Sequence, residues 1–201
     1  MGCDIHCYVE YKPIGCDPLD PLRWWPFCDR INPGRNYTLF GHIAGVRSEG
    51  PPVVEPRDVP SDMAWRADQD YWINIDVNGQ FPDAEGWCAP HRAQQYAAGG
   101  SILAGSYIPT SRTTTTSVGE RLTVVLGEEY RGQPTKVSHP DWHHHTWLTV
   151  EEFEKAMRAS VEGETPESYH PPGVEYWALL AAMKELQRLG QEVRIVIWFD
   201  N

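Results

Sequence analysis

The stretch Cys3-Asp-Ile-His-Cys-Tyr-Val-Glu-Tyr11 alternates between two kinds of side chain along its whole length. The odd positions are apolar or aromatic, whereas aspartate, histidine, tyrosine and glutamate occupy the even positions. Because successive side chains of a strand point to opposite faces, this pattern predicts a β-strand with one core face and one polar face. Residues 191–200 are largely apolar on both faces, which predicts a second strand that is central in its sheet.

Three further stretches carry the spacing and the end signals of helices. Residues 36–46 repeat apolar side chains at helical spacing, and Asn36 suits the N-terminal cap. Thr149-Val-Glu-Glu152 is a capping box, which predicts a helix over residues 150–160. Residues 173–189 carry an apolar stripe, and the glycine that follows suits the left-handed end of a helix.

The remaining elements are shorter and lie among loops. Strands are predicted over residues 71–77 and 121–126, with a short edge strand within 23–28. We therefore predict an α+β fold with a single mixed β-sheet, the N- and C-terminal strands central, helices packed mainly on one face, and long Pro- and Gly-rich loops. The length of 201 residues predicts a single domain, with an inserted loop or arm around residues 101–121.

Composition restricts the partners of this chain. It carries 28 acidic and 17 basic residues, a net charge of -11 that repels a phosphate backbone, so we expect no nucleic-acid partner. No window approaches the roughly 20 apolar residues of a membrane span, and no leader-like segment opens the sequence. We expect a cytoplasmic protein without a membrane partner. The five cysteines include no C-x-x-C pair and are expected to be reduced thiols.

Several well-defined catalytic motifs are absent from the sequence. It contains no G-x-x-x-x-G-K-[ST] phosphate loop, no G-x-G-x-x-G after a strand, no H-E-x-x-H and no G-x-S-x-G. Catalytic or binding residues are therefore expected in clusters of polar side chains.

One such cluster is His139-Pro-Asp-Trp-His-His-His-Thr-Trp147. In an extended conformation His143 and His145 share a face with Trp147, whereas the residues between them take the other face. Two imidazoles beside a carboxylate could bind a divalent metal such as Zn²⁺ or act as general acid and base. The alternative interpretation is a polar turn with partly exposed histidines.

A second cluster is the polar face of the first strand, where Asp4 and His6 are followed by Glu10. A carboxylate two residues from a histidine can orient its ring or share a metal with it. The alternative is that these residues form a buried, hydrogen-bonded pair with a structural role, or a strand face exposed to solvent. The predicted catalytic set is Asp4, His6, His143 and His145, and the predicted metal ligands are Asp4, His6 and His143.

Arginines beside aromatic residues form the third cluster. Arginine forks suit phosphate or carboxylate groups, and aromatic rings suit planar groups. A small anionic, nucleotide-like ligand would match both. The alternative is that the arginines pair with the abundant acidic residues. The predicted ligand-binding residues are Arg35, Asn36, Tyr37, Arg47, Arg57 and Trp147.

The opening Met1-Gly-Cys-Asp-Ile-His6 resembles that of a family of small bacteriophage and prophage proteins. The same family resemblance extends to Arg35-Asn-Tyr-Thr-Leu-Phe40, to Pro56-Arg-Asp-Val-Pro60, to the Trp-Leu-Thr that ends at Thr149, and to the closing Phe-Asp-Asn. It implies a phage-encoded protein in the cytoplasm of an infected bacterium. It also supports treating the following residues as one group: Asp4, His6, Arg35, Asn36, Tyr37, His143 and His145. Where this chain has the second histidine of His143-His-His145, the family has a small residue, so the resemblance implies a metal role for His143 more than for His145.

Three functional hypotheses follow. The first is a phage accessory protein that binds a small anionic or nucleotide-like metabolite and could hydrolyse it with metal assistance, for example to counter a host defence signal. The second is a non-catalytic protein that sequesters the same ligand. The third is an interaction module that binds a host or virion protein through its Trp-rich loops.

Overall fold

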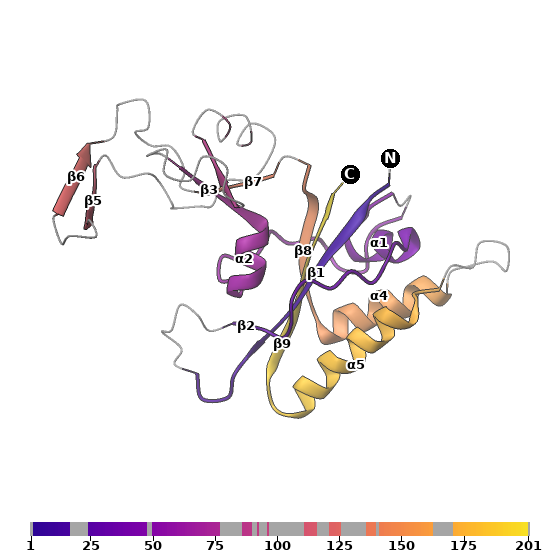
Figure 1. The fold of residues 1–201 in the computed structure, drawn as a ribbon. Helices are drawn as coiled ribbons and strands as arrows, with labels where there is room; N and C mark the ends of the chain where they lie inside the picture. Colours follow the sequence, from indigo (N-terminus) through magenta and orange to yellow (C-terminus); the bar gives the residue numbers. More distant parts are fainter. Residues whose placement is uncertain are drawn as a thin grey trace. The chain divides into compact units, whose positions relative to one another are not determined.

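The computed structural model describes residues 2–16, 24–47, 50–76, 86–89, 111–115, 121–125, 136–139, 141–162 and 171–200, together with Arg92 and Tyr96. Contacts between residues divide the chain into two compact units. Unit 1 consists of Met1–Asp68 and Trp142–Asn201, and unit 2 is the intervening segment Gln69–Asp141 (Figure 1). Unit 1 is therefore assembled from both ends of the sequence.

Unit 1 contains a four-stranded sheet in the order β2-β1-β9-β8. Its strands are β1 (Asp4–Lys12), β2 (Trp25–Pro26), β8 (His143–Thr149) and β9 (Glu192–Asp200). β1 and β9 are the inner strands, and they pair over nine residues from Asp4 opposite Asp200 to Lys12 opposite Glu192. The predicted pairing of the two terminal strands is confirmed, and it brings the two chain ends together (Figure 1).

Three helices cover one face of this sheet: α1 (Tyr37–Ala44), α4 (Val150–Glu162) and α5 (Val174–Arg188) (Figure 1). The odd-numbered residues of β1 face these helices and are buried with their neighbours on β9. This removal of apolar surface from water is the main stabilising term of the fold. The strand residues of this core are Cys3, Ile5, Cys7, Val9, Val193, Ile195, Ile197 and Phe199.

The predicted helix ends are confirmed in atomic detail. The Asn36 side chain accepts a hydrogen bond from the backbone N–H of Leu39 at 2.8 Å and caps α1. At the start of α4, Thr149 and Glu152 each accept a hydrogen bond from the other's backbone N–H, at 3.2 and 2.9 Å. Gly190 follows α5 with a φ of 84°, a left-handed conformation that glycine adopts without strain.

The even-numbered face of β1 is polar in sequence yet buried in the structure. His6 is 6% exposed and Glu10 is fully buried. Arg194 pairs with Glu10 at 2.8 Å and with Asp62 at 3.0 Å, so this buried carboxylate and guanidinium satisfy each other. Aromatic rings cover the rest of the face, where Tyr8 stacks on Trp198 at 5.0 Å.

The described residues of unit 2 form two small sheets. In the first, β3 (Trp72–Ile75) lies between β4 (Trp87–Cys88), which is parallel to it, and β7 (Lys136–Ser138), which is antiparallel. In the second, β5 (Ser111–Thr115) pairs with β6 (Arg121–Val125). The predicted strand over residues 121–126 is thus confirmed. Most of the predicted arm at 101–121 lies outside the described residues.

The α+β class is confirmed, but the single mixed sheet is wrong. The described strands form three sheets, and the one that holds both terminal strands is entirely antiparallel. The prediction merged short strands such as β3 into the main sheet because hydrophobic pattern does not reveal pairing partners. Helix α2 (Trp65–Tyr71) was not predicted, because only Ala67 and Tyr71 are buried within it and its other residues are mostly charged or polar. That both units form a single domain stays a prediction.

Candidate functional site

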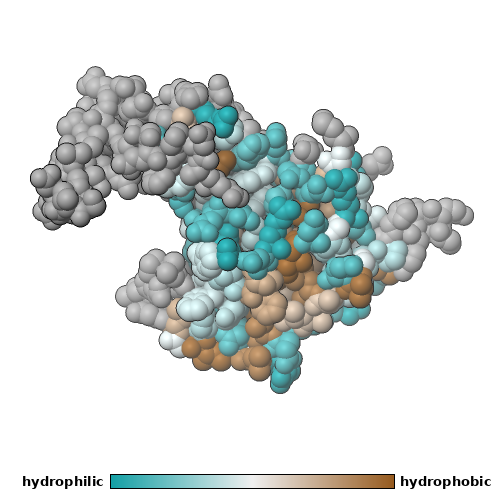
Figure 2. Space-filling view, in the orientation of Figure 1, coloured by the Kyte–Doolittle hydropathy of each residue, from teal (hydrophilic) through white to brown (hydrophobic). Residues whose placement is uncertain are grey.

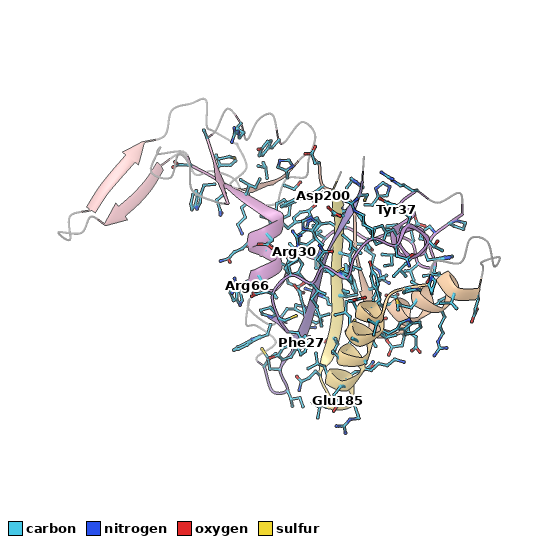
Figure 3. All side chains as sticks on the ribbon, turned by 45° about the vertical axis from the view of Figure 1, so that its right-hand side comes forward. Phe27, Arg30, Tyr37, Arg66, Glu185 and Asp200 are labelled. Atoms are coloured by element: carbon cyan, nitrogen blue, oxygen red, sulfur yellow. The ribbon has the colours of Figure 1, made fainter. Side chains whose placement is uncertain are left out.

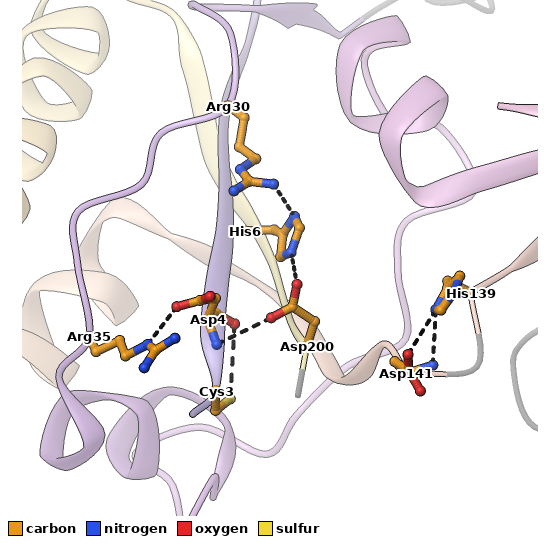
Figure 4. A network of polar contacts seen from close by, with 8 residues as sticks. All are labelled: Cys3, Asp4, His6, Arg30, Arg35, His139, Asp141 and Asp200. Atoms are coloured by element: carbon orange, nitrogen blue, oxygen red, sulfur yellow. Dashed lines mark hydrogen bonds and ion pairs between the residues drawn. The ribbon is translucent and has the colours of Figure 1, made fainter. Parts of the chain in front are cut away.

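Five polar residues form a connected network at the end of the sheet where β1 begins and β9 ends (Figure 4). We call it the terminal cluster, and it consists of Asp4, His6, Arg30, Arg35 and Asp200. In Figure 3, Arg30, Tyr37 and Asp200 lie toward this end, whereas Glu185 on α5 lies at the opposite end of unit 1.

His6 is the centre of the terminal cluster. Its Nε2 lies 2.9 Å from Asp200 Oδ2, and its Nδ1 lies 3.2 Å from Arg30 Nη1. A guanidinium only donates hydrogen bonds, so Nδ1 must be the acceptor and Nε2 must carry the proton that is donated to Asp200. The imidazole stacks on Trp198 at 5.3 Å, which holds the ring in place.

Asp4 connects the His6–Asp200 pair to Arg35. The backbone N–H of Asp4 donates to Asp200 Oδ1 at 3.2 Å, and its side chain accepts from Arg35 Nε at 2.6 Å. This guanidinium holds the pKa of the Asp4 carboxyl below its usual range. The Arg35 guanidinium also lies directly over Gly2, where a Cβ would overlap it. A glycine at position 2 is therefore needed for this close approach.

Two predicted ligand-binding residues lie beside the terminal cluster. The Tyr37 hydroxyl accepts a hydrogen bond from the backbone N–H of Cys3 at 3.2 Å, and the Arg47 guanidinium lies 4.7 Å above the Tyr37 ring. Burial raises the pKa of the Cys3 thiol, while the nearby charges of Arg47 and Arg35 oppose this rise. The Cys3 side chain packs in the core between the sheet and the helices.

Of the predicted histidine cluster, Trp142 lies against His6 with ring centroids 6.1 Å apart, whereas His143 lies outside the terminal cluster. His143 is paired with Phe199 of β9, and their rings stack at 6.3 Å on the side of the sheet that the helices cover. His6 and Asp200 lie on the other side. The sequence predicts that His143 meets Asp4 and His6, and the structure does not bring them together.

A β-bulge explains why the predicted alternation fails in β8. The pairing register shifts between His143 and Thr146, and His144 adopts a φ of 48°. The extra residue places His143 on the helix-facing side, whereas Trp147 pairs with Val196 on the other side. His143 and Trp147 therefore do not share a face, contrary to the prediction.

The histidines of β8 make contacts with each other and with one acid. His143 Nδ1 lies 2.6 Å from His144 Nδ1, and His145 Nε2 lies 3.5 Å from Asp58. Burial and the neighbouring imidazoles lower the pKa of His144. Within the described ranges, no three His, Cys, Asp or Glu side chains lie close enough together to hold a metal ion. The metal set of Asp4, His6 and His143 is not assembled in this structure.

Two further predicted ligand-binding residues are engaged in holding the fold. Arg57 forms a two-pronged ion pair with Glu152, at 2.5 and 2.8 Å, and its guanidinium lies 4.2 Å above the Trp147 ring. This pairing raises the pKa of Arg57 and lowers that of Glu152. Arg57 and Trp147 thus anchor the loop of residues 50–60 to α4, and Asn36 is used as a helix cap.

Sequence reasoning missed Arg30, Asp200 and Gly2. Arg30 lies in an irregular loop and no pattern marks it. Asp200 could have been found, because antiparallel pairing of the terminal strands places it opposite Asp4. Gly2 could not, because its importance depends on the path of the Arg35 side chain.

No protein-family model, curated protein or solved structure matches this chain. None of the described helices combines the length and the apolar character needed to cross a bilayer. In the space-filling view, hydrophilic residues cover much of the surface around the chain ends, and hydrophobic ones gather toward the opposite end of the sheet (Figure 2). Fold and site together define an α+β protein with a buried histidine, paired with a partly exposed aspartate, at an arginine-rich end of its sheet.

Proposed function

We propose that this protein binds a small anionic, nucleotide-like molecule at the terminal cluster. The observation that carries the proposal is the presence of three guanidinium groups at the start of β1. Arg35 pairs with Asp4, Arg30 contacts His6, and Arg47 lies over the ring of Tyr37. The chain as a whole has a net charge of -11, so a local gathering of guanidinium groups is what an anionic ligand would need in order to bind.

The arginines are accessible to a ligand. Arg30 and Arg47 are exposed, and the Arg35 side chain is 50% exposed although it pairs with Asp4. An exposed guanidinium presents a planar fork of donors that matches phosphate and carboxylate oxygens. The Tyr37 ring beside Arg47 offers an aromatic face to a planar group such as a base.

His6 and Asp200 extend the proposal from binding to reaction. A carboxylate that accepts the N–H of an imidazole orients the ring and stabilises the imidazolium that forms when the other nitrogen takes a proton. We propose that this pair provides acid–base catalysis for hydrolysis of the bound molecule. Metal assistance stays a prediction from the sequence. So does the setting of a phage accessory protein that acts against a host defence signal.

Sequestration without reaction is the second candidate, and one observation favours it. Both ring nitrogens of His6 already have hydrogen-bonding partners, Arg30 on one side and Asp200 on the other. A histidine in this state has no lone pair available for a proton from water.

Calorimetric titration tests the binding step. Inorganic phosphate and nucleoside mono-, di- and triphosphates are titrated into the protein at low and at moderate salt. We expect Arg35→Met to weaken binding by about tenfold or more, the effect of losing hydrogen bonds to a charged group. Arg158→Met is the matched control, because Arg158 also pairs with a single acid, Glu154, on the surface of α4. Equal affinity in both variants would contradict the proposal.

Product analysis separates the two candidates. After prolonged incubation of the protein with the nucleotide that binds best, chromatography shows whether that ligand is intact. Recovery of a hydrolysed product that is lost in His6→Gln supports the enzyme. Recovery of unchanged ligand, still retained by the protein, supports sequestration.

A further inference from the structure

In this structure Arg30 covers the nitrogen of His6 that would act as a base. We propose that a bound phosphate draws Arg30 away from His6 Nδ1, so that ligand binding itself exposes the catalytic base. This inference rests on the proposed function, and it names the substrate class as a phosphate ester.

The proton positions on His6 follow from its partners. Arg30 has no acceptor atom, so at 3.2 Å its Nη1 donates to the lone pair of Nδ1. Nε2 then carries the only ring proton and donates it to Asp200 at 2.9 Å. Nδ1 is therefore the only basic nitrogen of the ring, and the guanidinium occupies the position that a reacting water needs.

Asp200 is fixed independently of His6. Its Oδ2 accepts from His6, while its Oδ1 accepts from the backbone N–H of Asp4 at 3.2 Å. The carboxylate is thus held at both oxygens, and it keeps the His6 proton on Nε2. Asp200 is a positioning residue for the base.

Of the two partners in the Arg30–His6 contact, Arg30 is the one that can move. His6 is 6% exposed and stacks on Trp198, whereas the Arg30 side chain is exposed on the loop between β2 and α1. Its neighbour Ile31 keeps the loop backbone attached to β1 through a hydrogen bond from its N–H to the Cys7 carbonyl at 3.0 Å. The Arg30 side chain can therefore change its rotamer and leave Nδ1 without movement of the loop backbone.

Displacement by phosphate is energetically favoured over the resting contact. The resting bond joins a charged donor to a neutral imidazole, whereas a bond from the same guanidinium to a phosphate oxygen joins two opposite charges. A phosphate can also accept two parallel bonds from one guanidinium, which the single Nδ1 lone pair cannot.

The uncovered base then supports hydrolysis. Nδ1 takes a proton from a water molecule as the water oxygen forms a bond to phosphorus. The phosphorus–oxygen bond to the leaving group breaks, and its electron pair stays on the leaving oxygen. That oxygen takes up the proton from Nδ1, which restores neutral His6 and releases phosphate and an alcohol.

Long-range ¹H–¹⁵N correlation spectra test this inference, because they report the protonation and hydrogen bonding of each imidazole nitrogen. Spectra of the wild-type protein are recorded with and without inorganic phosphate and adenosine monophosphate, with His6→Gln used for assignment. We expect phosphate to shift the Nδ1 signal of wild-type His6. Arg30→Met should show the shifted signal without phosphate and bind phosphate about tenfold more weakly. Arg30→Lys should restore part of the affinity, and Arg158→Met should match wild type.

The outcomes separate this inference from the proposed function. If phosphate binds the wild-type protein, leaves the His6 Nδ1 signal unchanged and binds Arg30→Met with equal affinity, the displacement is overturned while the anion site stands. If neither phosphate nor adenosine monophosphate binds the wild-type protein, both proposals are overturned.

Discussion

At the scale of single residues, the terminal cluster depends on the absence of a side chain as much as on the presence of charged ones. Arg35 reaches Asp4 only by passing over Gly2, where even one methyl group would overlap its guanidinium. The opening Gly-Cys-Asp-Ile-His segment therefore contributes space, a backbone donor and the side chains of Asp4 and His6 to one cluster.

Gly2→Ala should displace Arg35 from Asp4 without disturbing the core, because the overlap falls on the movable end of a half-exposed side chain. We expect Gly2→Ala to lose as much phosphate affinity as Arg35→Met, about tenfold. The double variant should lose no more than either single one, because both changes remove the same interaction. Titration of all three variants measures this, and additive losses would contradict the role given to Gly2.

At the scale of elements, one glutamate joins a helix, a strand and a loop. Glu152 completes the capping box of α4 and also holds Arg57, whose guanidinium reaches the carbonyl of Trp147 at the end of β8. The capping box was predicted from local sequence, but the Arg57 partner was not, because 95 residues separate it from Glu152. The same distinction applies to β8, where a bulge overrides the alternation expected of an isolated strand.

Arg57→Met should lower the free energy of unfolding at pH 7 by about 1–2 kcal/mol, because the pair is partly exposed. Arg57 lowers the pKa of Glu152 in the folded state. The stabilisation is therefore fully present above the unfolded value of about 4.3 and is lost as the pH falls through the lower folded value. Urea denaturation of both proteins between pH 7 and pH 3 should show the difference shrinking with acid. A constant difference would mean that the charge of Glu152 is not involved.

At the scale of the whole molecule, the site exists only when the two ends of the chain pair. His6 and Asp200 are separated by 194 residues and meet through the β1–β9 ladder. On its polar face this ladder carries the Glu10–Arg194 pair, in which Glu10 is fully buried and the Arg194 side chain is 6% exposed. Burial raises the pKa of Glu10, so the carboxylate depends on its guanidinium partner.

Arg194→Met should destabilise unit 1 by about 3–5 kcal/mol, because it leaves a buried carboxylate without its charged partner. We expect the amide hydrogens of β1 and β9 to be the slowest to exchange, because they exchange only through global unfolding. Their free energy of exchange should therefore fall in Arg194→Met by as much as the free energy of unfolding. Lys12→Met is the control on the same strand pair. Its partner Glu192 is exposed, so Lys12→Met should lower the free energy of unfolding by less than about 1 kcal/mol. If hydrogen exchange and urea denaturation gave different decreases in free energy, these strands would be opening locally.

The sequence by itself determined what depends on neighbouring residues. The period-two pattern of residues 3–11 predicted β1 and its two faces, and Asn36, Thr149 and the glycine after α5 predicted the helix ends. These features follow from backbone geometry within a few residues, so they are present in the local sequence.

Only the tertiary structure decided which distant residues meet. It placed Asp200 and Arg30 on His6, and it moved His143 to the helix-facing side. It also paired Arg57 with a glutamate and divided the strands of the described residues among three sheets. These outcomes depend on strand register, on a single inserted residue and on the path of long side chains, and none of these is encoded in the spacing of residues along one segment.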